Sequence, residues 1–67
     1  MKKHSVKIAG HATSITLEDA FWDELKDEAG RQGKSINALI AEIDEMREEN
    51  LSSAIRVYLL KGLQSRL

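Results

Sequence analysis

The stretch His11-Ala12-Thr13-Ser14-Ile15-Thr16-Leu17 decides the fold of this chain. It contains neither Gly nor Pro, and its residues fall into two alternating sets. Because successive side chains of a β-strand point to opposite faces, the alternation predicts a half-buried strand over residues 11–17. We expect the core side to carry Thr13, Ile15 and Leu17, and the outward side to carry Ala12, Ser14 and Thr16.

The rest of the chain predicts mainly helices, which would leave this strand without a substantial partner. A lone strand exposes unpaired backbone N–H and C=O groups and is unstable or prone to associate in water. The same strand from a second copy would pair with it about a two-fold axis. We therefore expect an intertwined homodimer whose intersubunit antiparallel β-ribbon is the working surface.

A shorter extended segment, residues 4–8, precedes this strand. Its apolar residues Val6 and Ile8 stand at even positions, whereas Ile15 and Leu17 stand at odd positions. The apolar phase therefore slips between the two segments, and a turn or bulge must absorb the slip. Gly10 is the natural position for it.

Two amphipathic helices are predicted next. The first spans about residues 19–32, begins with acidic residues that complement the helix dipole, and is followed by Gly33, which suits a left-handed stop. The second spans about 35–48, with Ser35 as a good N-cap.

A third helix is predicted over about residues 52–66. Its apolar residues cover well over half of its circumference, which favours burial between subunits. For the chain as a whole, the predicted core and dimer contacts are Ile15, Leu17, Trp22, Leu25, Leu39, Ile40 and Ile43.

Length and composition limit the protein class. Sixty-seven residues allow a single domain, 1–67, and such a domain buries little surface alone. Without Cys it has no disulfide and no Cys-based metal site, so dimerisation is the expected source of stability. Because neither a membrane span nor the apolar core of a signal peptide is evident, we expect a bacterial-type cytoplasmic protein.

The net charge is −1, but the charges are unevenly distributed. Lys2, Lys3 and Lys7 precede the first acid, Glu18, so the first seventeen residues are purely basic. A basic ribbon in front of acidic helices would suit DNA, whereas the plainer interpretation is that these lysines keep the N-terminal segment soluble.

The order of strand, helix, Gly turn and Ser-capped helix resembles the ribbon-helix-helix DNA-binding proteins, the class of the Arc and MetJ repressors. The residues that match are 13–17 running into an acidic helix start, Leu25 with Ala29, Gly33, and 35–40. Further matches at 10–15 and 50–57 resemble a subgroup of small bacterial members and cover nearly the whole chain. The resemblance implies a mainly α fold with one short β-strand, and an additional C-terminal helix.

The resemblance also implies two DNA contacts. The outward ribbon residues Ala12, Ser14 and Thr16 would face base edges in the major groove. The start of the second helix would hold a phosphate, because its N–H groups and positive dipole end suit an anion; a plain helix cap at Ser35 is the alternative. The family usually has Arg, Lys, Asn or Gln on the ribbon, and Ala12 departs from that pattern, which leaves room for contacts from Lys7, His11 or the N-terminal lysines. The implied phosphate contacts are Lys34, Ser35, Ile36, Asn37 and Lys7.

Other chemistry has weaker support. His4 and His11 could join carboxylates at a metal, but ribbon-end positions explain them better. Phe21 and Trp22 could stack on bases, but their spacing with Leu25 indicates core. Because no nucleophile, base and oxyanion site come together, we expect no enzyme, and we expect no cofactor or metal.

The sequence thus predicts a dimeric, sequence-specific DNA-binding protein, such as a transcriptional repressor. It leaves open whether the protein is a stand-alone regulator or has an antitoxin-like or plasmid-maintenance role. It also leaves open whether dimers assemble further on DNA. The alternative is a dimerisation or adaptor module that binds a protein partner through the third helix.

Overall fold

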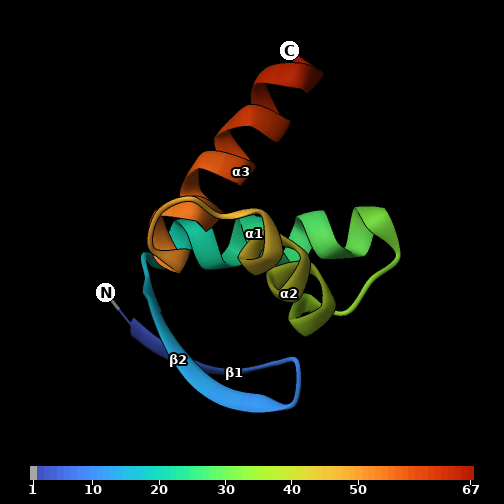
Figure 1. The fold of residues 1–67 in the computed structure, drawn as a ribbon. Helices are drawn as coiled ribbons and strands as arrows, with labels where there is room; N and C mark the ends of the chain where they lie inside the picture. The colour runs from blue at the N-terminus through green and yellow to red at the C-terminus, as the bar shows by residue number, and fades with distance from the viewer. Residues whose placement is uncertain (1) are drawn as a thin grey trace.

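The computed structural model describes residues 2–67, and Met1 lies outside the described residues. Figure 1 shows a curved hairpin on one side of two helices, with a third helix rising on the other side. The predominance of helix agrees with the predicted class. The elements in chain order are β1 (Lys2–Ile8), β2 (His11–Leu17), α1 (Asp19–Gln32), α2 (Ile36–Met46) and α3 (Leu51–Arg66).

The prediction of a single short strand is wrong, because β2 pairs in the same chain with β1. The two strands are antiparallel and are joined by Ala9 and Gly10, with Ile8 opposite His11. Both turn residues have positive φ, 51° for Ala9 and 82° for Gly10. Two-residue turns with two positive φ angles match the twist of the strands that they join. One edge of β2 therefore has a strand partner within the same chain, and its other edge has no strand partner within the described residues.

This turn also explains the slip in the apolar phase. In the observed register, His4 lies opposite Ile15 and Val6 lies opposite Thr13, so even positions of β1 share a face with odd positions of β2. Val6, Ile15 and Leu17 are buried on this inner face. Thr13 shares the inner face but is exposed, which differs from its predicted core position.

Local capping fixes the helix ends. Gly33 has φ 68° and ends α1, and the backbone N–H of Lys34 donates to the Ala29 carbonyl at 2.9 Å. The Asn50 side chain caps α3 by accepting from the N–H of Ser53 at 2.9 Å. The second helix is shorter than 35–48, because the backbone is already extended after Met46.

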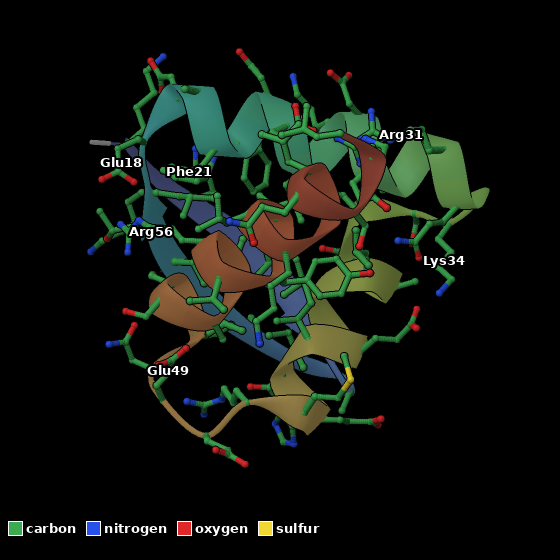
Figure 2. The ribbon with its side chains drawn as sticks, turned by 90° about the horizontal axis from the view of Figure 1, so that it is seen from above. Glu18, Phe21, Arg31, Lys34, Glu49 and Arg56 are labelled. Carbon is green, nitrogen blue, oxygen red and sulfur yellow. The ribbon has the colours of Figure 1, made fainter. Side chains whose placement is uncertain are left out.

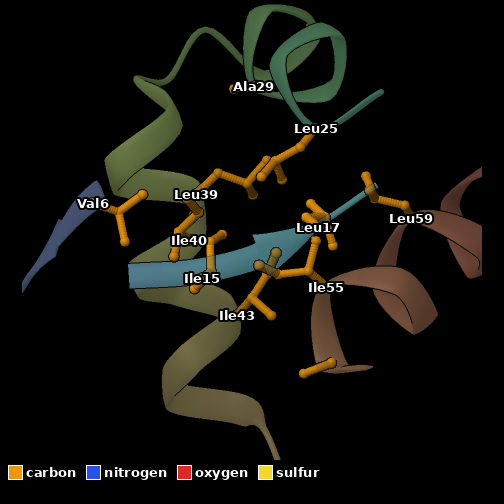
Figure 3. Packing of buried hydrophobic residues seen from close by; sticks show 11 residues of the cluster. Val6, Ile15, Leu17, Leu25, Ala29, Leu39, Ile40, Ile43, Ile55 and Leu59 are labelled. Atoms are coloured by element: carbon orange, nitrogen blue, oxygen red, sulfur yellow. The ribbon is translucent and has the colours of Figure 1, made fainter. Parts of the chain in front are cut away.

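The core lies between the inner face of the hairpin and the three helices (Figure 3). Leu17, Leu25, Leu39, Ile40 and Ile55 are its largest fully buried side chains. Of the predicted core and dimer residues, Trp22 is only partly buried, and the other six, Ile15, Leu17, Leu25, Leu39, Ile40 and Ile43, are buried within one subunit.

The third helix closes this core, as Figure 3 shows for Ile55 and Leu59. Burying apolar area in this way stabilises a fold by roughly 25 cal/mol per Å². One face of α3 is thus buried without a second subunit, while Leu60 and Leu63 remain exposed.

Charged groups on α1 hold the far end of α3. Glu28 accepts from Gln32 at 2.7 Å, from Arg31 at 2.7 Å and from Arg66 at 3.0 Å. The amide of Gln32 and the guanidinium of Arg31 lower the pKa of the Glu28 carboxyl, because both stabilise its ionised form. Within residues 2–67, none of the helices has the length and apolar character of a membrane span.

We expect Ala9→Asn to stabilise the protein. A non-glycine residue in the left-handed region costs on the order of 1–2 kcal/mol, and Asn tolerates that region better than Ala. A gain of about 1 kcal/mol would raise the Tm by roughly 4–8 °C in thermal unfolding. Ala12→Asn, at an exposed strand position, is the control and should give no gain. An unchanged Tm for Ala9→Asn would argue against a left-handed backbone conformation at Ala9.

Replacing Glu28 by Gln should destabilise the protein most at neutral pH. The lowered pKa means that the ionised carboxylate stabilises the fold above its ordinary pKa of 4.5, and that this contribution disappears as the pH falls through the folded value. The Tm difference between wild type and Glu28→Gln should therefore shrink between pH 7 and pH 3. Glu45→Gln, which alters an exposed acid, should show a small and constant difference. A Glu28→Gln difference that persists at pH 3 would argue against this role.

Candidate nucleic-acid interface

The hairpin has an outer face that turns away from the three helices (Figure 1). The pairing register puts Lys3 opposite Thr16, Ser5 opposite Ser14, and Lys7 opposite Ala12. These side chains have the parity opposite to buried Val6 and Ile15, so they project outward. All six are exposed: Lys3, Ser5, Lys7, Ala12, Ser14 and Thr16. We call these six residues the outer ribbon face.

The outer ribbon face is basic. Neither strand contains an acidic residue. Lys3 and Lys7 make no ion pair within residues 2–67, and both are exposed. Elsewhere in the described chain the bases are mostly neutralised, since ion pairs engage Lys26, Arg31, Lys34, Arg47, Arg56 and Arg66. The positive charge that remains available is therefore concentrated on the hairpin.

The size and chemistry of this face suit duplex DNA. A major groove about 12 Å wide accepts a two-stranded β-ribbon. Hydroxyl groups such as those of Ser14 and Thr16 can donate to or accept from base edges, and a lysine can contact either a phosphate or the acceptor atoms of guanine. One subunit supplies this complete two-stranded surface.

The sequence prediction placed Ala12, Ser14 and Thr16 outward, and they lie there. It considered the N-terminal lysines as further contacts, but it did not align Lys3 and Ser5 with these three residues. The sequence does contain a signal for this alignment. The large apolar residues stand at even positions in residues 4–8 and at odd positions in residues 11–17. A two-residue turn across this slip pairs the segments and aligns the three residues of β1 with those of β2.

The start of α2 forms a separate surface from the outer ribbon face. The Ser35 hydroxyl accepts from the N–H of Ala38 at 3.1 Å, so Ser35 is a helix cap. The N–H of Leu39 donates to the Ser35 carbonyl, which leaves Ile36 and Asn37 as the first-turn donors without an acceptor in the described chain. These two N–H groups could bind an anion.

Two of the predicted phosphate contacts have other roles in the fold. The Lys34 ammonium lies 2.6 Å from a carboxylate oxygen of Glu42, so its charge is neutralised on α2 itself (Figure 2 shows where Lys34 lies). The Ile36 side chain is partly buried against the core. Any contact of Ile36 with a phosphate would therefore come from its backbone, while the side chain of Asn37 is exposed.

His4 and Trp22 pack together on the inner side of the hairpin, whereas His11 is exposed. His4 stacks on Trp22 with ring centroids 3.7 Å apart and planes 6° apart, and its Nε2 is buried without a hydrogen-bond partner in the described chain. His11 is exposed beside the turn. Within residues 2–67, no group of three or more His, Cys, Asp or Glu could hold a metal ion.

An ion pair ties the first turn of α1 to α3. Arg56 donates to Glu18 at 2.8 Å and lies 5.9 Å from the centre of the Phe21 ring (Figure 2). The Arg56 hydrogen bond lowers the pKa of the Glu18 carboxyl. Phe21 is thus covered by a cation of its own chain, and its contacts are those of a core residue.

Comparison with known proteins identifies the family. A family model described as a ribbon-helix-helix domain matches residues 1–63. The comparison with curated proteins returned no match, and neither did the comparison with solved structures. Ribbon-helix-helix domains in general bind DNA and regulate transcription, and they are typically not enzymes. With this match over nearly its whole length, the chain belongs to the ribbon-helix-helix family.

Proposed function

We propose that this protein is a homodimeric, sequence-specific DNA-binding regulator of transcription that inserts its hairpin into the major groove. The observation that carries the proposal is the outer ribbon face, where Lys3 and Lys7 are unpaired and no carboxylate is present. The family match gives this face a partner, because a ribbon in the groove is how these domains contact DNA.

The two kinds of residue on this face have different tasks. Lys3 and Lys7 supply charge to phosphates, which strengthens binding at every sequence. Ser5, Ser14 and Thr16 contact base edges and supply discrimination, and Ala12 contributes at most an apolar contact to a thymine methyl. The first-turn N–H groups of Ile36 and Asn37, which have no acceptor in the described chain, add a phosphate contact from the start of α2.

A reversal of charge at Lys7 should weaken DNA binding without changing its sequence preference. Removing one lysine–phosphate contact should reduce the slope of log K against log salt by about one. The measurement is a salt titration of Lys7→Glu and wild type on the same duplex. Lys26→Glu, at an exposed lysine of α1, is the matched control and should keep the wild-type slope. Equal slopes for Lys7→Glu and wild type would show that the hairpin does not contact the DNA phosphates through Lys7.

Replacement of the hydroxyls should change which duplexes are preferred. Selection from a random duplex pool should give wild type a motif with two-fold symmetry. Ser14→Ala and Thr16→Ala should relax individual positions by about 1–3 kcal/mol per lost base contact, within a fold that their exposed positions leave intact. An identical motif for all three proteins would argue against base contacts from these hydroxyls.

An adaptor role is the alternative, and the exposed apolar residues of α3 favour it. Val57, Leu60 and Leu63 are 40%, 52% and 44% exposed. A protein that acts only as an adaptor would ignore duplex DNA at low salt and still associate through α3. The random-pool selection separates the two functions, because an adaptor yields no enriched duplex.

A further inference from the structure

The side of α3 that does not face the core carries exposed leucines. Seen from above, α3 lies between α1 and α2, so that one of its flanks faces each of them (Figure 2). Leu60, Leu63 and Leu67 are three and four residues apart, a spacing that places side chains on one face of a helix, and all three are exposed. Contiguous apolar surface with a polar rim is typical of an interaction site. We call these three residues the leucine ridge.

The leucine ridge borders an apolar groove where α3 crosses α1. The groove has a volume of about 320 Å³ and is lined by Ala20, Phe21, Glu24, Leu59, Leu60 and Leu63. The carboxylate of Glu24, the one charged group in this lining, is already bound to Arg31 at 2.9 Å and to Arg66 at 3.2 Å. The groove therefore offers apolar surface without a free charge in its lining.

Hydrogen-bonded ion pairs hold the two helices that form the groove. Arg56 of α3 donates to Glu18, just before α1, at 2.8 Å, and Arg66 of α3 donates to Glu28 of α1 at 3.0 Å. A surface that is already formed costs less to order when a partner binds to it. We therefore expect the groove to be present in the free protein.

The rim of the groove is acidic on the α1 side. Asp23 and Asp27 follow Ala20 by three and seven positions, so they lie on the same side of α1, and both are exposed. Asp27 makes no ion pair within residues 2–67, and Asp23 has only the exposed Lys26, at 3.5 Å. On the α3 side, Leu60 is followed one turn later by the uncharged Gln64. One rim of the groove is thus negative and the other is neutral.

We propose that this groove binds an amphipathic helix of a different protein, with aliphatic side chains on one face and lysine or arginine along one edge of that face. The aliphatic side chains lie between the leucine ridge and Phe21, and the bases face Asp23 and Asp27. Helices that bind in grooves use anchors at such spacings of three, four and seven residues. Because α3 rises away from the hairpin (Figure 1), this partner and a duplex would contact different sides of the molecule.

The acidic rim also separates this occupant from others. An anionic membrane would bring negative headgroups against Asp23 and Asp27. The α3 helix of a second copy offers aliphatic side chains, but its Arg56 and Arg66 are engaged in ion pairs within their own chain. Its remaining base, Lys61, lies on the α2 flank, away from the leucine ridge. A foreign helix with free bases beside its apolar face therefore matches the groove better.

The first test measures the binding of two synthetic helical peptides to the full chain by titration calorimetry. Both peptides have leucines three and four residues apart and equal helix content, and they differ only beside the leucines, where one has lysine and the other glutamate. The lysine peptide should bind at least about tenfold more tightly at low salt, and added salt should reduce this advantage, because the acids are exposed. Equal affinities, or no binding of the lysine peptide, would overturn the proposal.

A neutral polar residue on the leucine ridge tests the apolar contact. Leu60→Gln should weaken binding of the lysine peptide by about tenfold, because an amide would be buried against aliphatic side chains. Its Tm should match that of wild type, because Leu60 is exposed. Met46→Gln changes another exposed apolar residue, outside the groove, and should bind the peptide like wild type. A Leu60→Gln protein with wild-type affinity would contradict the proposed contact.

Reversal of one charge tests the acidic rim. Asp27→Lys should weaken binding of the lysine peptide and strengthen binding of the glutamate peptide, because the rim then attracts the opposite charge. Glu45→Lys reverses an exposed acid on α2 and should leave the preference between the two peptides unchanged. If Asp27→Lys prefers the lysine peptide as strongly as wild type does, the rim does not select the partner.

Two further measurements test the other occupants. Vesicles that contain anionic lipid should not bind the protein, and binding that is lost in Leu60→Gln would assign the groove to a membrane instead. Sedimentation should give wild type and Leu60→Gln the same mass across a dilution series. A lower mass for Leu60→Gln would show that a second copy occupies the groove, and would overturn the proposal.

The peptide measurements contain no DNA, so they stand apart from the DNA-binding proposal. If the lysine peptide binds as expected and wild type selects no duplex, the groove keeps its partner and the DNA-binding function fails. If wild type selects a duplex with two-fold symmetry and the lysine peptide does not bind, the DNA-binding function stands and the groove proposal fails.

Discussion

The antiparallel pairing of β1 with β2 is the interaction on which the rest of the structure depends. Two turn residues, Ala9 and Gly10, adopt positive φ and set a register that pairs every residue of β1 with one of β2. This register gathers Val6 with Ile15 and Leu17 on one face, which the helices then cover. The opposite face is left with lysines and hydroxyls. One backbone turn thus determines both the core side and the proposed DNA side of the hairpin.

The pairing also changes what a second subunit has to contribute. A lone strand has no partner on either edge, but here β1 pairs with one edge of β2, and α3 covers the core with Ile55 and Leu59. A second subunit is therefore not needed to supply the first strand partner of β2 or to cover the core beside α3. The side of α3 that points away from the core is where apolar surface is still exposed.

The charges of the helices are largely paired, whereas the lysines of the hairpin are not. The acids of α1 bind Arg31 and Arg66, and Glu18 binds Arg56, so the charges of α1 and α3 are largely satisfied by each other. Exposed ion pairs of this kind contribute little stability each, but they leave few bases free. The lysines of the hairpin stand apart from this network. An acidic net charge is therefore compatible with a basic face, because every acid of the sequence follows the hairpin.

The sequence by itself determined the local structure. The alternation of residues 11–17, the left-handed stop at Gly33 and the Ser35 cap depend on neighbours within a few positions, and such signals can be taken directly from the chain. The family resemblance followed from the same residues. The alternation also placed Ser14 and Thr16 on the outward side, because the face to which a strand residue points depends only on its position in the strand.

The tertiary structure alone decided which partner each element has. Ala at the first position of a tight turn is a weak hairpin signal, so the pairing of β1 with β2 became evident only when the register was known. The neutralisation of Lys34 by Glu42 and the burial of one face of α3 depend on residues brought together by folding. Local patterns determine the element that a residue forms, whereas its neighbours in space determine whether its charge or apolar surface remains available for binding.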